Sequence, residues 1–114
     1  MKQNIIYDKS FDFALKIIGL YKILLSNKEY IITKQLLRSA TSIGANVTES
    51  IAAQSKKEFI SKLSISSKAA RETKYWLLLL DKSKLVDLDY TEYLNDIEEI
   101  IRILTSIIKT SQER

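Results

Sequence analysis

The chain has 114 residues with no cysteine, histidine or proline and only two glycines, and its 18 Lys and Arg against 14 Asp and Glu give a formal net charge of +4. This length accommodates one domain, and the absence of cysteine excludes disulfides and thiolate chemistry. Scarce helix breakers and 46% hydrophobic residues favour long helices. No apolar run approaches the roughly 20 residues of a membrane-spanning helix, and the first residues do not resemble a signal peptide, so we expect a soluble cytoplasmic protein with no membrane partner.

The first two helices are predicted by apolar residues that recur at helical spacing. The first is expected over about residues 8–26, and the second over about residues 34–53 with Thr33 as its N-cap. The main apolar stripe of the first helix is Phe11, Ala14, Ile18, Tyr21 and Leu25, widened by Phe13, Ile17, Leu20 and Leu24. The stripe of the second helix is Leu36, Ala40, Ile43, Val47 and Ile51. Both stripes are expected to face one core.

The opposite side of the second helix differs from an ordinary solvent-exposed surface. Its residues are mostly small or polar rather than long and charged, namely Arg38, Ser42, Ala45, Asn46, Glu49, Ala52 and Ala53. Such a face favours contact with another molecule, and a second copy of the chain is the first candidate. Gly44 indicates close helix packing, because a glycine in a helix interior costs roughly 1 kcal/mol relative to alanine.

The charged residues of this face need partners. Arg38 and Glu49 lie roughly 16 Å apart along the helix axis, so they cannot pair with each other. Either they pair across a subunit interface, or Glu49 pairs with Lys62 on the next helix, or both are simply exposed to solvent. Glu72 on the third helix is expected to border apolar side chains, where an unpaired carboxylate is costly. We expect Arg38 or Asn46 as its partner, and impaired folding or assembly in Glu72→Ala.

Polar residues before the last two helices have the spacing of capping boxes. Ser55 with Glu58, and Asp89 with Glu92, lie three residues apart, so each side chain can bond the backbone N–H of the other. These pairs mark the starts of two further helices.

The third and fourth helices are predicted over about residues 56–82 and 90–110. The core stripe of the third is Phe59, Leu63, Ser66, Ala70, Thr73, Leu77 and Leu80. The stripe of the fourth is Tyr93, Ile97, Ile100, Leu104 and Ile107, with Leu94, Ile101 and Ile108 alongside. Because the connections have fewer than ten residues, neighbouring helices are expected to be antiparallel. The predicted fold is an all-α, up-down-up-down antiparallel four-helix bundle, with residues 1–114 as a single domain.

Charge is distributed unevenly along the chain. Residues 56–86 carry eight basic and three acidic side chains, whereas residues 87–114 carry three basic and seven acidic ones. The two regions either complement each other, within or between subunits, or leave a basic surface for a polyanion. One side of the third helix carries Lys57, Ser61, Ser64, Lys68, Arg71, Tyr75 and Lys82. Such a face can hold a phosphate backbone and stack a base, or it is an ordinary solvated surface.

Composition argues against several kinds of active site. A di-iron site in a four-helix bundle needs Glu-x-x-His pairs, and the chain has no histidine. Nucleophilic catalysis lacks both cysteine and histidine, and Gly19 and Gly44 stand alone rather than in a phosphate-binding loop. We predict no metal, no cofactor, no catalytic residue and no enzymatic activity.

Three segments together resemble the 23S rRNA intervening-sequence protein family. They are QLLRSATSIGANVTES at residues 35–50, KLSIS at residues 62–66 and ARETKYWL at residues 70–77. The resemblance extends from Phe11 to about Ile108, nearly the whole chain. Members of this family are small bacterial four-helix bundle proteins, some of them encoded within insertions in 23S rRNA genes.

The resemblance implies a bundle that assembles. Family members look like homopentameric barrels, which suits the small, polar second face of the second helix. The accessory variability proteins of diversity-generating retroelements form a related branch with a similar fold, and they work with a reverse transcriptase and nucleic acid. Thr48 and Ser50 flank Glu49 where alanine and glycine are common in the family. With serine in place of glycine at position 50, a very tight approach at that turn is not expected.

The sequence therefore predicts a non-enzymatic accessory protein that forms a homo-oligomeric ring of five subunits and binds RNA or DNA through the basic face of the third helix. The alternative is a scaffold that binds a protein partner and has no nucleic-acid role. Salt distinguishes the two, because binding to phosphates weakens steeply as salt rises. Replacing Lys68 and Arg71 by alanine is expected to flatten that salt dependence.

Overall fold

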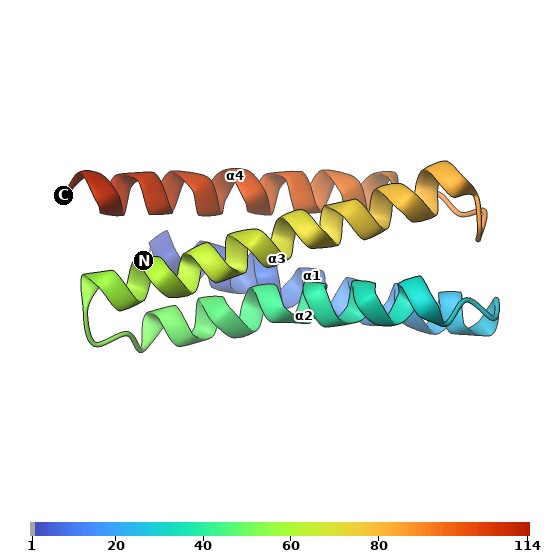
Figure 1. Cartoon of the computed structure of the whole chain (residues 1–114), viewed down its shortest axis with the longest axis horizontal. Helices are drawn as coiled ribbons and strands as arrows, with labels where there is room; N and C mark the ends of the chain where they lie inside the picture. Colours follow the sequence, from blue (N-terminus) through green and yellow to red (C-terminus); the bar gives the residue numbers. More distant parts are fainter. Residues whose placement is uncertain (1) are drawn as a thin grey trace.

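Figure 1 shows long helices lying side by side, with successive helices running in opposite directions. They are α1 (Lys2–Ser26), α2 (Ile31–Ile51), α3 (Lys56–Ser83) and α4 (Thr91–Glu113). The structure, a computed structural model, describes residues 2–114, with side chains described from Ile5 onward. Those residues contain no strand, and the molecule measures 46 × 21 × 20 Å along its principal axes. The predicted all-α four-helix bundle is confirmed.

The helices pack in the order in which they occur along the chain. α2 contacts both α1 and α3 extensively and α3 contacts α4, whereas the contact that closes the bundle, between α1 and α4, is the sparsest. α1 begins six residues earlier than predicted, and the other helix ends lie within three residues of their predicted positions. No helix in the described part of the chain is long and apolar enough to cross a lipid bilayer.

The start of α2 is capped differently from the prediction. Thr33 is not the N-cap, because it lies inside the first turn of a helix that begins at Ile31. Instead, the buried Glu29 carboxylate accepts hydrogen bonds from the backbone N–H groups of Ile31, Ile32 and Thr33 at 3.3, 3.2 and 2.7 Å, and from the Thr33 hydroxyl at 2.6 Å. Burial alone raises the pKa of Glu29, but these hydrogen bonds outweigh it, and the net pKa is lowered. A charged side chain outside the helix therefore satisfies three free N–H groups at once.

The two predicted capping boxes have different outcomes. The Ser55 hydroxyl accepts from the Glu58 N–H at 3.0 Å as predicted, while the Glu58 carboxylate accepts from the Gln54 N–H at 2.9 Å rather than from that of Ser55. The box predicted from Asp89 and Glu92 is wrong. The N-cap position of α4 has no side-chain cap, and the Asp89 carboxylate accepts from the Thr91 N–H at 3.0 Å.

The core follows the predicted stripes on α2, α3 and α4 and departs from them on α1. The buried apolar residues of α1 are Ile6, Phe13, Ile17, Leu20 and Leu24. The prediction is wrong for Phe11 and Ile18, which are 53% and 38% exposed, and is confirmed for the four residues that widened the stripe, Phe13, Ile17, Leu20 and Leu24. Because α1 is apolar around most of its circumference, periodicity alone does not identify the side that packs inward. Ile51, predicted as core, lies exposed at the last position of α2.

Small polar residues join α2 to α3 inside the core. The buried Ser66 hydroxyl donates to the Ile43 carbonyl at 2.8 Å, and the Thr73 and Ser39 hydroxyls bond each other at 2.9 Å. On the other side of α2, a Cβ added at Gly44 would lie 3.4 Å from the Ser10 hydroxyl oxygen of α1. Small side chains therefore bring α2 close to both neighbours, as predicted for Gly44.

Candidate nucleic-acid and assembly surfaces

The predicted partner of Glu72 is present. Arg38 of α2 forms an ion pair with the Glu72 carboxylate of α3, and the Trp76 indole N–H donates to the same carboxylate oxygen at 2.9 Å. Arg38 also donates two hydrogen bonds to the Gln35 side-chain oxygen, at 2.9 and 3.2 Å. Arg38 is confirmed as the partner. Asn46 as a partner is wrong, because its amide donates to the Ser42 carbonyl and hydroxyl instead, at 2.9 and 3.1 Å.

Glu49 pairs with Lys62 of α3, one of the alternatives that the sequence left open. Their charged atoms lie 2.8 Å apart. The hydrogen bond to Glu49 and the charge of that carboxylate raise the pKa of Lys62. Because both side chains remain partly exposed, salt screens the pair and it contributes little to stability. The charged residues on the second face of α2 thus find partners within the subunit, and their role in a subunit interface stays a prediction.

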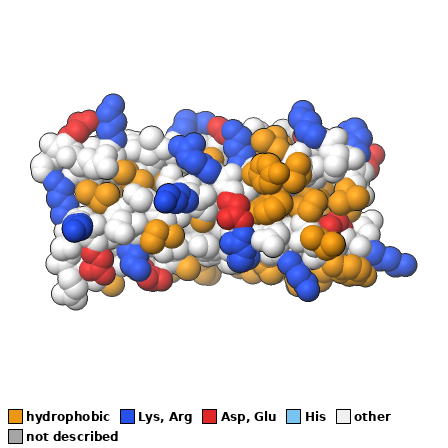
Figure 2. All heavy atoms as spheres, viewed as in Figure 1, with side chains coloured by type: hydrophobic (Ala, Val, Ile, Leu, Met, Phe, Trp, Pro, Cys, Tyr) orange, Lys and Arg blue, Asp and Glu red, His pale blue; other side chains and the backbone are white. Residues whose placement is uncertain are grey.

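The predicted basic face of α3 is exposed along its length. Its charged and aromatic members are Lys57, Lys68, Arg71, Tyr75 and Lys82, all of which are exposed. None of the four cations forms an ion pair with another described residue. Figure 2 shows Lys and Arg side chains over α3 and the adjoining part of α4, with few carboxylates between them. The structure thus places these five residues on one accessible surface.

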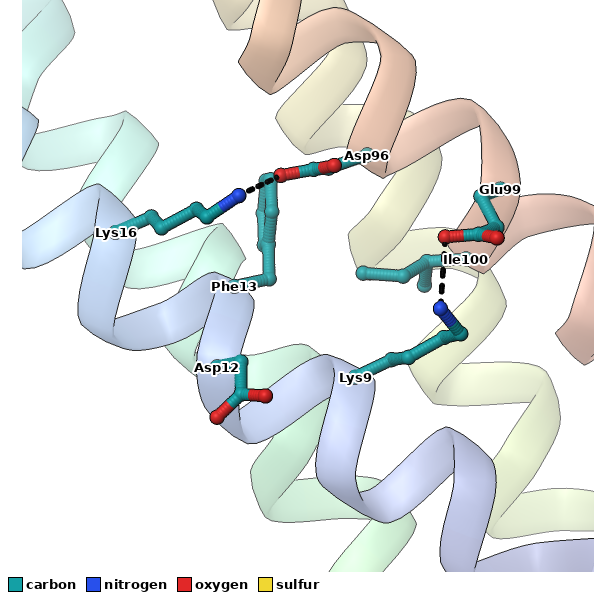
Figure 3. A pocket seen from close by; sticks show the side chains of 7 residues that line it. All are labelled: Lys9, Asp12, Phe13, Lys16, Asp96, Glu99 and Ile100. Atoms are coloured by element: carbon teal, nitrogen blue, oxygen red, sulfur yellow. Dashed lines mark hydrogen bonds and ion pairs between the residues drawn. The ribbon is translucent and has the colours of Figure 1, made fainter.

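The acidic side chains of α4 mostly face other elements. Lys16 of α1 pairs with Glu92 and Asp96 at 2.6 and 2.8 Å, and Lys9 pairs with Glu99 at 3.0 Å. Figure 3 shows both lysines reaching from α1 to α4 around a hollow that Phe13 and Ile100 also line. The hydrogen bonds and charges of Asp96 and Glu92 raise the pKa of Lys16. Glu92, Asp96 and Glu99 therefore pair with lysines of α1 and do not neutralise the basic face of α3.

Glu98 is an α4 carboxylate that pairs with α3. Lys74 forms an ion pair with Glu98, and the positive charges of Arg102 and Arg71 act on it as well. The close approach of Lys74, with the positive charges of Lys74, Arg102 and Arg71, lowers the pKa of Glu98 despite some desolvation. Arg102 and Lys74 were not predicted as part of this surface. The position of Arg102 four residues after Glu98 on a predicted helix is the signal in the sequence that could have identified it.

Two separate apolar surfaces are exposed. On α1, Tyr7, Phe11, Leu15 and Ile18 are exposed. Tyr7 and Phe11 also line a hollow of ≈ 190 Å³ between α1 and α2, whose α2 side consists of Thr41, Gly44, Ala45 and Thr48. The rings of Tyr7 and Phe11 stack with centroids 6.3 Å apart. The second surface is on α3, where Ile65 and Tyr75 are 44% and 55% exposed beside Trp76. Figure 2 shows hydrophobic side chains gathered where the second half of α3 meets the first half of α2.

The sequence pattern does not predict the α1 surface, because it places two of its residues, Phe11 and Ile18, in the core and gives Tyr7 and Leu15 no role. The signal that could have revealed it is the number of apolar residues on α1, which is more than one buried stripe can accommodate. The described residues contain no group of three or more Asp and Glu placed to hold a metal ion.

Comparison with known proteins identifies close relatives. Residues 2–106 match the family described as 23S rRNA-intervening sequence protein. A solved structure from Bacteroides thetaiotaomicron VPI-5482, described as a protein with unknown function from the S23 ribosomal protein family, is 49% identical in sequence. It superposes with a TM-score of 0.91, and the match covers 96% of this chain and 99% of that chain. No curated protein matches the chain.

Proposed function

The chain belongs to the 23S rRNA-intervening sequence protein family, and we propose that it is a non-enzymatic accessory protein, one subunit of a homopentameric ring that binds RNA or DNA through the basic face of α3. The non-catalytic role rests on the sequence, which has neither histidine nor cysteine. The subunit number follows from the resemblance to the family, whose members look like barrels of five.

The observation that supports nucleic-acid binding is that most acidic residues of α4 form ion pairs within the subunit, whereas the cations on the basic face of α3 form none with a described residue. Four of the seven acidic residues in the acidic last quarter are paired, three with lysines of α1 and one with Lys74. Lys57, Lys68, Arg71 and Lys82 remain exposed and have no ion-pair partner among the described residues. A row of free cations along one helix is suited to phosphate groups, which neutralise them with release of counterions.

The two exposed apolar surfaces support assembly. An isolated subunit would leave the aromatic and aliphatic side chains of α1, and those of α3, in contact with water. Because these surfaces differ from each other, a contact between the α1 surface of one subunit and the Ile65 side of α3 in the next, which leaves Tyr75 accessible on the basic face, would be heterologous. A heterologous contact that closes on itself produces a ring. The small residues of α2 lie between the two surfaces and would allow close approach.

The test is size-exclusion chromatography with light scattering, with and without a structured RNA, at low and at physiological salt. We expect a particle of five subunits that gains mass with RNA at low salt and loses it as salt rises. In Lys68→Ala/Arg71→Ala, the slope of log affinity against log salt should fall by about 1.4 to 1.8, the value for two lost phosphate contacts.

A matched control removes two positive charges elsewhere. Lys22→Ala/Lys34→Ala changes exposed lysines of α1 and α2 and should leave that slope unchanged. A ring that ignores RNA at every salt concentration, or that captures a protein independently of salt, would favour the scaffold. A monomer at working concentration would contradict the assembly half of the proposal.

A further inference from the structure

We infer that the basic face of α3 binds single-stranded rather than duplex nucleic acid, with one unpaired base stacked on the Tyr75 ring beside Trp76. This inference rests on the proposed function and specifies the ligand of the same surface. It follows from two features that the structure places next to each other, a cluster of cations and an oriented pair of aromatic rings.

Arg71 and Lys68 lie about one and two helical turns from the Tyr75 ring. Lys68, Arg71 and Tyr75 are spaced at i, i+3 and i+7, so they share one face of α3. Nearby, Lys74 pairs with Glu98, so that carboxylate does not neutralise Lys68 or Arg71 through an ion pair. A phosphate held by Arg71 or Lys68 would bring its own or the adjacent nucleotide within reach of the Tyr75 ring.

The two aromatic rings contact each other, and Trp76 is anchored by a hydrogen bond. The rings of Tyr75 and Trp76 meet edge to face, with centroids 5.1 Å apart and an angle of 67° between the planes. Trp76 is held by its hydrogen bond to Glu72, which is held in turn by Arg38. Tyr75 is 55% exposed, so much of its ring area is open to a ligand. A ring held in place by its neighbours binds a base with little loss of side-chain freedom.

Geometry favours an unpaired base over a base pair. Tyr75 stands on the outer side of a straight helix, and in a duplex the faces of the bases are already stacked against one another. The same cations would hold duplex phosphates, but the aromatic ring would then contact no base. Stacking is thus available only to a single strand or to an unpaired loop, and it adds to the affinity that the phosphates provide.

The experiment uses the assembled protein and its one tryptophan as the reporter. Three labelled probes with equal numbers of phosphates are compared by anisotropy across a salt series: a single strand of mixed sequence, a duplex, and an abasic strand that has the backbone without bases. We expect the single strand to bind most tightly and to quench Trp76 fluorescence. The abasic strand and the duplex should bind through charge alone and leave the fluorescence unchanged.

Two substitutions of Tyr75 separate stacking from charge. Tyr75→Ala should weaken binding of the single strand by about 5- to 150-fold, the effect of one stacked base, and leave the abasic strand and the salt slope unchanged. Tyr75→Phe keeps the ring and should bind like the unchanged protein. Arg71→Ala should instead weaken all three probes and flatten the salt slope.

Each contrary result identifies what is wrong. Equal binding of the three probes, with no effect of Tyr75→Ala, overturns the inference and leaves the proposed function standing. No binding of any probe even at low salt overturns the proposed function and the inference with it. A change in particle mass in Tyr75→Ala, with single-strand affinity unchanged, would place Tyr75 in a subunit contact and also overturn the inference.

Discussion

The α2–α3 and α1–α4 contacts hold the same bundle together by different physical means. Where α2 meets α3, buried small residues bring the backbones together, and Ser66 and Thr73 satisfy their hydroxyls inside the core. Where α1 meets α4, contact is sparse, a hollow of ≈ 190 Å³ opens, and exposed lysines bridge to carboxylates (Figure 3). The first contact depends on packing, which salt hardly affects, whereas the second depends on charges that salt screens.

The largest expected effect is the loss of a core side chain near α2. Leu77 of α3 is fully buried, and Leu77→Ala should lower the free energy of unfolding by about 2–5 kcal/mol. Ile100→Ala is the counterpart beside the α1–α4 hollow and should fall at the lower end of that range, because its surroundings can relax into existing space. Urea unfolding of both variants at two salt concentrations measures the difference. An equal loss in the two variants would contradict the contrast between the two contacts.

The second largest expected effect on stability is the loss of the buried Glu29 charge. Glu29→Gln removes the charge that caps α2 and should cost about 1 kcal/mol, in the range of helix caps. The pKa of Glu29 is lowered in the folded state, so the unfolded chain binds its proton at higher pH. The stability from Glu29 is therefore present above its ordinary pKa of about 4.3 and is lost as pH falls through the lower folded value.

Thermal melts between neutral pH and pH values below the ordinary glutamate pKa check this assignment. The difference in stability between the unchanged protein and Glu29→Gln should shrink as the solution is acidified. Glu113→Gln, which changes an exposed glutamate at the end of α4, is the matched control and should stay close to the unchanged protein at each pH. A constant difference across that range would show that the charge of Glu29 is not what caps α2.

The fold was predictable because three of the helices have one clear apolar stripe. The pairing of Glu49 with Lys62 was also within reach of the sequence, since neighbouring antiparallel helices bring such positions together. Tyr90, by contrast, was placed only at the edge of a helix. It is almost fully buried, its hydroxyl donates to the Val86 carbonyl at 2.8 Å, and burial raises its pKa to about 12. Packing of a connection between helices has no periodic signal in the sequence.

The errors on α1 and α2 share a physical cause. The inward side of α1 depends on where α2 and α4 lie, which a helix apolar on most sides does not reveal. The cap on α2 depends on the path of the chain between the helices, where Lys28 adopts a left-handed conformation with φ 64° and the chain turns to bring Glu29 beside the first turn. From the local sequence alone, Thr33 near the expected helix start is the simplest N-cap to predict. Contacts set by tertiary geometry were therefore the ones that sequence reasoning missed.

The ion pairs between α1 and α4 should have a smaller, salt-dependent effect. Lys16→Ala removes the bridge to Glu92 and Asp96, and because the lysine is partly exposed the cost should be at most about 1 kcal/mol at low salt. At about 1 M salt, where screening acts over roughly 3 Å, most of that cost should disappear. Lys22→Ala, on the same helix and without an ion pair to any described residue, is the control. A cost that persists at high salt would mean that the aliphatic part of Lys16 packs against α4.

The smallest expected effects are those of replacing the two helical glycines, Gly19 of α1 and Gly44 of α2, with alanine. A Cβ added at Gly19 of α1 would meet nothing within 4 Å, so Gly19→Ala should stabilise the subunit by about 0.5–1 kcal/mol through helix propensity. A Cβ at Gly44 would touch Ser10 at 3.4 Å, so Gly44→Ala should gain less, because α1 and α2 must accommodate the methyl group. Thermal melts of the two variants measure the difference. If Gly19→Ala instead lowers the stability of the assembled particle, the side of α1 that carries Gly19 contacts a neighbouring subunit. Assembly would then cover α1 where its contact with α4 is sparse.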